Sequence, residues 1–77
     1  MSTSLEIHGF KVYGSDVNHG FDYLKNLRPV EAKEMFDHAR KSIDQDHHFE
    51  AHIPGKGNTH YVLIHKSDGA YELKYKS

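Results

Sequence analysis

The fold is decided by residues 47–76, HHFEAHIPGKGNTHYVLIHKSDGAYELKYK, in which apolar and polar side chains alternate between turn residues. Alternation with a period of two is typical of β-strands that bury one face. We expect three strands, over 48–53, 59–66 and 70–76. The turns between them lie at 54–58 and at Asp68-Gly69, a dipeptide that favours two-residue hairpin loops. The sequence therefore predicts an antiparallel sheet.

A helix is predicted immediately before this sheet. Pro29 suits the first turn of a helix because proline lacks the amide hydrogen that would be unpaired there. The apolar residues that follow recur at helical spacing and form one stripe: Ala32, Met35, Phe36, Ala39 and Ile43. We expect this helix to end at Asp44-Gln45-Asp46 and its stripe to cover one face of the sheet.

The N-terminal part of the chain predicts smaller elements. Residues 5–13 alternate like a strand, and a β-bulge at Gly9 would explain why the apolar phase changes there. Apolar residues at helical spacing predict a short first helix over 16–26. The fold class is therefore α+β, with one main helix packed on a three- to four-stranded antiparallel sheet. We expect a single domain spanning residues 1–77.

The hairpin at Asp68-Gly69 decides which side chains share a face. With a two-residue loop, Ile64 lies opposite Leu73, and the helix covers the even-numbered residues of the second strand, His60 among them. The other face is then open, with apolar groups at Tyr61 and Leu63 ringed by histidines and charges. We predict a binding surface formed by this face and the adjoining turn: His48, His52, Lys56, Tyr61, Leu63, His65 and Lys74.

Composition and charge exclude several classes of protein. Ten Lys+Arg against eleven Asp+Glu give a formal net charge of −1, which argues against a strongly basic nucleic-acid arm. The absence of cysteine removes disulfides, thiol catalysis and cysteine-ligated zinc. No signal peptide and no apolar run long enough to span a membrane are recognisable. We expect a cytoplasmic protein with no membrane association.

Eight histidines raise the question of metal binding or acid–base chemistry. His48 and His52 lie four residues apart on one predicted strand, about 13 Å at ~3.3 Å per residue, which is too far to share an ion. Only His48, His65 and Glu72 converge in the predicted register, and solvated histidines are the favoured interpretation there. We therefore predict no metal, no cofactor and no catalytic residue.

The favoured function is a non-catalytic interaction module whose open sheet face binds a protein partner or a second copy of the chain. Nucleic-acid binding is the alternative. In that case Tyr61 would stack on a base, while Lys56 and Lys74 would contact phosphates.

The segment Gly57-Asn58-Thr59-His60, placed between strands and ahead of an Asp-Gly turn, resembles the catalytic region of HicA-type ribonuclease toxins. The resemblance covers residues 29–76, and the matching positions are Gly57, His60, Asp68 and Gly69. It implies a fold like that of double-stranded-RNA-binding domains and a ribonuclease activity with His60 as acid–base. This sequence differs from the family in four ways. It has Asn58-Thr59 where the family has serine, and it has an added N-terminal segment. We expect no closing C-terminal helix, and the net charge is not basic.

Overall fold

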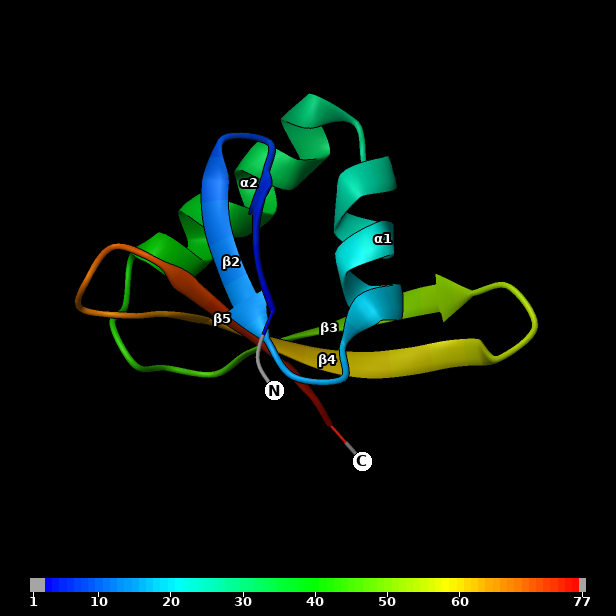
Figure 1. Ribbon diagram of the computed structural model, residues 1–77. Helices are drawn as coiled ribbons and strands as arrows, with labels where there is room; N and C mark the ends of the chain where they lie inside the picture. The colour runs from blue at the N-terminus through cyan, green and yellow to red at the C-terminus, as the bar shows by residue number, and fades with distance from the viewer. Residues whose placement is uncertain (1–2, 77) are drawn as a thin grey trace.

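The computed structural model describes residues 3–76 as a five-stranded sheet with two helices on one face (Figure 1). The elements in chain order are β1 (Thr3–Ile7), β2 (Phe10–Gly14), α1 (Asn18–Asn26), α2 (Pro29–Arg40), β3 (His47–Ile53), β4 (Gly57–His65) and β5 (Tyr71–Tyr75). The predicted α+β class is confirmed. The short first helix predicted over 16–26 is present as α1, and it shares the core. The structure differs from the prediction in having five strands, two of which pair in parallel, instead of three or four antiparallel strands.

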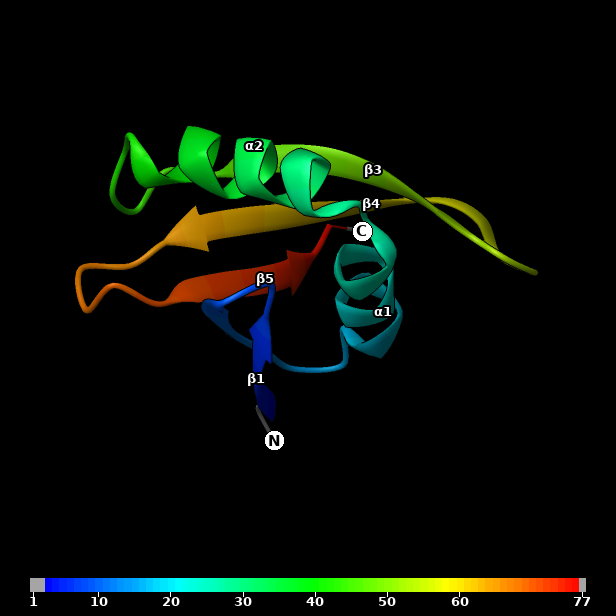
Figure 2. The same cartoon turned by 90° about the horizontal axis from the view of Figure 1, so that it is seen from above.

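The sheet is mixed, with the strand order β1-β2-β5-β4-β3. β2 and β5 run parallel, and the other neighbours are antiparallel. Figure 2 shows α2 running along β3 and β4, and α1 contacts β3 and β1. The helices and the sheet share one core, made of Ile7, Val12, Val17, Phe21, Leu24, Ala32, Phe36, Ala39, Ala51, Ile53, Tyr61, Leu63, Tyr71 and Leu73. Within residues 3–76, neither helix has the length and apolar character needed to cross a membrane.

The N-terminal segment is a hairpin, so the predicted bulge at Gly9 was wrong. Ile7 pairs with Phe10 across a two-residue loop in which His8 and Gly9 have φ of 52° and 85°. Two successive positive φ values are typical of a type I′ turn, which reverses the chain between antiparallel strands. The change of apolar phase therefore marks the start of a second strand.

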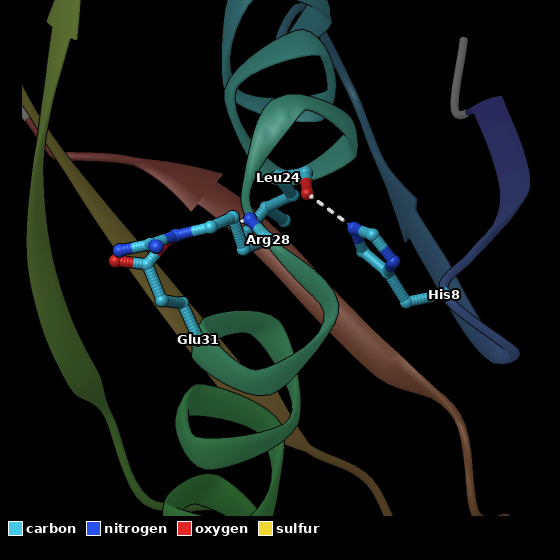
Figure 3. Close-up of polar contacts among 4 residues, drawn as sticks. All are labelled: His8, Leu24, Arg28 and Glu31. Carbon is cyan, nitrogen blue, oxygen red and sulfur yellow. Dashed lines mark hydrogen bonds and ion pairs between the residues drawn. The ribbon is translucent and has the colours of Figure 1, made fainter.

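The turn of this hairpin is attached to the last part of α1 (Figure 3). His8 Nε2 lies 3.1 Å from the carbonyl oxygen of Leu24, near the end of α1. Three residues before Glu31, the amide of Arg28 donates to the Glu31 carboxylate at 3.3 Å and so satisfies an unpaired donor at the start of α2. The first contact joins the hairpin to α1, and the second caps the start of α2.

The helix α2 begins at Pro29 as predicted but ends at Arg40, before the expected residues. Ala32, Phe36 and Ala39 are fully buried. Ile43 lies beyond the helix, 54% exposed, and was wrongly placed on the buried stripe. Its backbone forms an isolated parallel bridge with His65 instead.

The hairpin between β4 and β5 has a three-residue loop and not the predicted two-residue loop. The amide of Lys66 donates to the carbonyl of Ala70 at 2.8 Å, and the amide of Gly69 donates to the carbonyl of Lys66 at 3.0 Å. Gly69 has a φ of 88°, and the amide of Ala70 donates to Asp68 Oδ1 at 2.9 Å. Lys66 and Ala70 thus close the loop, which moves the strand pairing by one residue.

This shift turns every side chain of β4 to the opposite face from the predicted one. Leu63 lies opposite Leu73, where Ile64 was expected. Odd-numbered residues of β4 therefore face the helices and even-numbered residues face away. The prediction was wrong for each residue of β4 to which it gave a face: His60, Tyr61, Val62, Leu63, Ile64 and His65.

Candidate functional site on the outer sheet face

We call the side of the sheet opposite the helices the outer face. Strand parity places on it alternate residues of the four strands β2, β5, β4 and β3. Val62 and Ile64 form its floor, but they are only 6% and 5% exposed. The polar residues around this floor are Tyr13, His48, Glu50, His52, His60, Glu72, Lys74 and Lys76.

One end of the outer face carries a row of side chains from three strands and the residue that follows β5. Glu50 lies directly opposite His60, and Glu50 Oε2 is 3.4 Å from His60 Nε2. The amide of Lys76 donates to the carbonyl of His60 at 2.9 Å, which places Lys76 on the other side of this histidine. The Lys76 ammonium donates to His48 Nδ1 at 3.4 Å. One carboxylate, two imidazoles and one ammonium are thereby brought together.

The contacts in this row assign ring hydrogens to the two histidines when they are neutral. An ammonium can only donate, so His48 Nδ1 accepts from Lys76 and Nε2 carries the hydrogen. A carboxylate can only accept, so His60 Nε2 donates to Glu50 and Nδ1 keeps a free lone pair. The outer face thus combines a base, an N–H donor and an ammonium.

A second group of charges lies at the other end of the outer face. Lys66 Nζ is 3.2 Å from Asp44 Oδ1 and 3.8 Å from Glu72 Oε1, and Lys74 Nζ is also 3.8 Å from Glu72 Oε1. The hydrogen bond with Asp44 raises the pKa of Lys66. Burial, and then the charge of Glu72, raise the pKa of Tyr13 beside this group. Together with Lys76 and Glu50, these groups comprise three lysines and three carboxylates.

Only part of the predicted binding set lies together. His48, His52 and Lys74 are exposed on the outer face, His52 within 3.2 Å of Asn58, and Lys56 is exposed in the β3–β4 turn. Tyr61 and Leu63 were wrongly placed there, because they are 3% and 0% exposed beneath the helices. His65 was also misplaced: it faces the helix side, with its ring 4.9 Å from that of Tyr71.

The predicted binding set omitted five polar residues of the outer face: Tyr13, Glu50, His60, Glu72 and Lys76. His60 was assigned to the covered face because the loop length was wrong, and that assignment hid its contact with Glu50. The sequence did contain a signal for Lys76, because the two-residue alternation of β5 places it on the same face as Lys74.

The structure rules out the predicted convergence of His48, His65 and Glu72, because His65 lies on the other side of the sheet. Among residues 3–76, no three His, Asp or Glu side chains lie where they could hold a metal ion together. The titratable side chains of the outer face instead contact one another through hydrogen bonds and ion pairs.

Comparison with protein-family models, with curated proteins and with solved structures gave no match to this chain. A function must therefore be inferred from the chemistry of the outer face.

Proposed function

We propose that this chain is a binding module whose outer face binds a phosphate-bearing polymer, single-stranded RNA in particular. The observation that carries the proposal is the exposed row of His48, Lys76 and His60, with Lys74 beside it. Ammonium and imidazole N–H groups are donors that phosphate oxygens accept. The apolar floor is almost fully covered, which favours a polar ligand over a protein that docks through apolar contacts.

Histidine protonation would decide the net charge of this surface. The lysines Lys66, Lys74 and Lys76 balance the carboxylates Asp44, Glu50 and Glu72 in number. Each proton taken up by an outer-face histidine then adds one positive charge. We therefore expect RNA binding to strengthen as the pH falls from about 7.5 to about 5.5, and to weaken as the salt concentration rises.

The test is fluorescence anisotropy with a short labelled single-stranded RNA at both pH values. Lys74→Ala and Lys76→Ala should each weaken binding several-fold. The matched control is Lys33→Ala, which removes an exposed lysine from α2 on the other side of the molecule. Equal losses for Lys33→Ala and Lys76→Ala, or no binding at the lower pH, would overturn the proposal.

A second candidate function, RNA cleavage, is favoured by the contact between Glu50 and His60. In this reaction His60 Nδ1 takes the proton of a ribose 2′-hydroxyl, and the 2′-oxygen attacks the adjacent phosphorus. The bond from phosphorus to the 5′-oxygen breaks, and the leaving oxygen takes a proton from the pair formed by Lys76 and His48. The products are a 2′,3′-cyclic phosphate and a free 5′-hydroxyl. Glu50 would hold His60 in the required tautomer.

Cleavage is tested with RNA and with DNA of the same sequence, since DNA lacks the attacking hydroxyl. RNA should be cut and DNA bound but left intact. His60→Ala should abolish cutting, whereas His19→Ala, at an exposed position on α1, should not. Retention of cutting by His60→Ala, after purification that removes contaminating nucleases, would refute this second function.

A further inference from the structure

β3 forms one edge of the sheet and directs backbone groups away from it. The carbonyl of His60 accepts the amide of Lys76, so even-numbered residues of β4 bond toward β5 and odd-numbered residues bond toward β3. Phe49 and Ala51 lie opposite odd-numbered residues of β4 and therefore bond inward. Within residues 3–76, no strand pairs with the outward groups of the intervening residues, which are His48, Glu50 and His52.

The side chains along this edge alternate in a pattern that complements itself. Asp46, His48, Glu50 and His52 are all exposed and provide carboxylate, imidazole, carboxylate and imidazole at intervals of two residues. If a second copy runs antiparallel with its Glu50 opposite His48, its His52 lies opposite Asp46. Twofold symmetry repeats both pairs, and opposite charges directly across neighbouring strands stabilise their pairing.

A slip of two residues in either direction removes this complementarity. One slip places Glu50 opposite Glu50 of the second copy, and His48 opposite its His52. The other slip places His48 opposite His48, and Asp46 opposite Glu50. Like charges directly opposite each other destabilise strand pairing, so the pattern selects one register from its neighbours.

In the selected register Phe49 lies next to the twofold axis, opposite Phe49 of the second copy. It faces the helix side, where it would meet Phe49 of the second copy in a non-hydrogen-bonded pair, the kind in which side chains approach most closely. The Phe49 ring is half-buried, stacks on Tyr61 with centroids 5.8 Å apart, and lines a hollow of about 350 Å³ with Met35 of α2. A second copy would cover the exposed part of this ring.

We propose that two copies of this chain associate through antiparallel pairing of their β3 edges, with His48 opposite Glu50 and Phe49 opposite Phe49. The pairing joins the two sheets into one continuous sheet. Because the twofold axis is perpendicular to the sheet, both outer faces lie on the same side. The outer face proposed to bind RNA is thereby doubled in length, although pairing itself does not require RNA.

The experiment is sedimentation equilibrium near pH 6. The native chain should be a dimer. Glu50→Lys places a lysine opposite His48, and His48→Glu places a glutamate opposite Glu50, so each variant alone should be monomeric. An equimolar mixture should form a heterodimer, because the introduced lysine then faces the introduced glutamate and every other pair is native. Glu6→Lys makes the same change of charge on the β1 edge and should remain a dimer.

The other polar and titratable groups near the substituted residues are the same in all the variants. Lys76 contacts His48, His60 contacts Glu50, and Asn58 contacts His52. The hollows beside the helices add Glu31, Glu34, His38 and His47 near His48, and His19 and Asp22 near His52. The restored heterodimer therefore reports on the pairs across the edge, and it also excludes unfolding as the cause of monomeric behaviour.

A monomeric native chain, dimeric single variants, or a mixture that stays monomeric would each overturn the proposal. Disulfide formation checks the register, since the chain has no cysteine of its own. A mixture of His48→Cys and Glu50→Cys should form a disulfide between the two copies. Glu50→Cys alone should not, because position 50 lies opposite itself only in the slipped register. RNA binding is measured separately, so failure of the dimer and failure of the proposed function are distinguishable.

Discussion

Glu50 and His60 face each other across β3 and β4, with 3.4 Å between Oε2 of the carboxylate and Nε2 of the imidazole. Their side chains are 49% and 60% exposed, so the contact contributes little to folding stability. It instead orients the imidazole of His60 through its Nε2. The functional consequences of removing the carboxylate therefore differ for binding and for cleavage.

Glu50→Gln should tighten RNA binding while slowing any RNA cleavage. The substitution removes a negative charge from a surface that would contact phosphates. It also replaces a carboxylate, which only accepts, with an amide that can donate as well as accept, so the tautomer of His60 is no longer fixed. Anisotropy and a gel assay on the same RNA measure the two effects. If both activities change in the same direction, the separate roles assigned to Glu50 are incorrect.

Gly20→Ala should destabilise the protein although it lies in a helix. Alanine is favoured over glycine in a helix by about 0.8–1.0 kcal/mol. A Cβ at position 20 would lie 2.9 Å from Leu73 Cδ2 and 2.9 Å from Tyr61 Cε1, in the buried contact between α1 and the sheet. Overpacking of this kind costs about 1–3 kcal/mol. Urea unfolding measures the balance, and a gain in stability would contradict the tight approach of α1.

Phe36→Ala should lower the free energy of unfolding by about 3–5 kcal/mol, the range for truncation of a buried aromatic ring. Phe36 is 0% exposed, and its ring centroid lies 4.4 Å from that of Phe10 and 4.9 Å from that of Tyr71. The control on the same helix is Val30→Ala, because Val30 is 61% exposed. Chemical denaturation should show a change within about 0.5 kcal/mol for this control.

Stability should decline at alkaline pH, in part through Tyr61. Burial, and secondarily the proximity of Tyr75, raise the pKa of Tyr61 in the folded protein. The unfolded chain therefore loses this proton first, near pH 10, and the stabilisation present below that pH is lost as the pH rises toward the folded pKa. Tyr61→Phe should lose less stability than the native protein between about pH 9 and 11. Equal losses in urea titrations would contradict the direction of the shift.

The local elements were predictable because they depend on near neighbours in the chain. Pro29 and the spacing of Ala32, Phe36 and Ala39 identify α2, and alternation identifies the three C-terminal strands. The facing of β3 was also correct. The error in β4 came from one loop residue: an Asp-Gly dipeptide fits a two-residue loop and equally closes a three-residue loop with glycine at positive φ. Alternation alone could not correct this error. Val62, Leu63 and Ile64 are consecutive apolar residues, so both faces of β4 are apolar there in either register.

The candidate site was less predictable than the fold, because its members come from three strands. The sequence indicated His48, His52 and Lys74, whose facing follows from alternation within their own strands. His60 and its contact with Glu50 depend on how β4 is registered against both neighbours. An error of one residue in that register exchanges the buried and exposed sets, as it did for Tyr61 and Leu63.

By itself, the sequence determined the α+β class, the course of α2 and the alternating strands that follow it, because helix and strand periodicity are local properties. Only the tertiary structure decided that β2 lies parallel to β5, that α1 shares the core, and that Tyr61 is buried while His60 is exposed. Those features are set by backbone pairing between distant segments and by the closure of the Lys66–Ala70 loop. Hydrogen bonds between strands carry no signature in the sequence of either strand, so packing of the whole chain selects among registers that alternation leaves open.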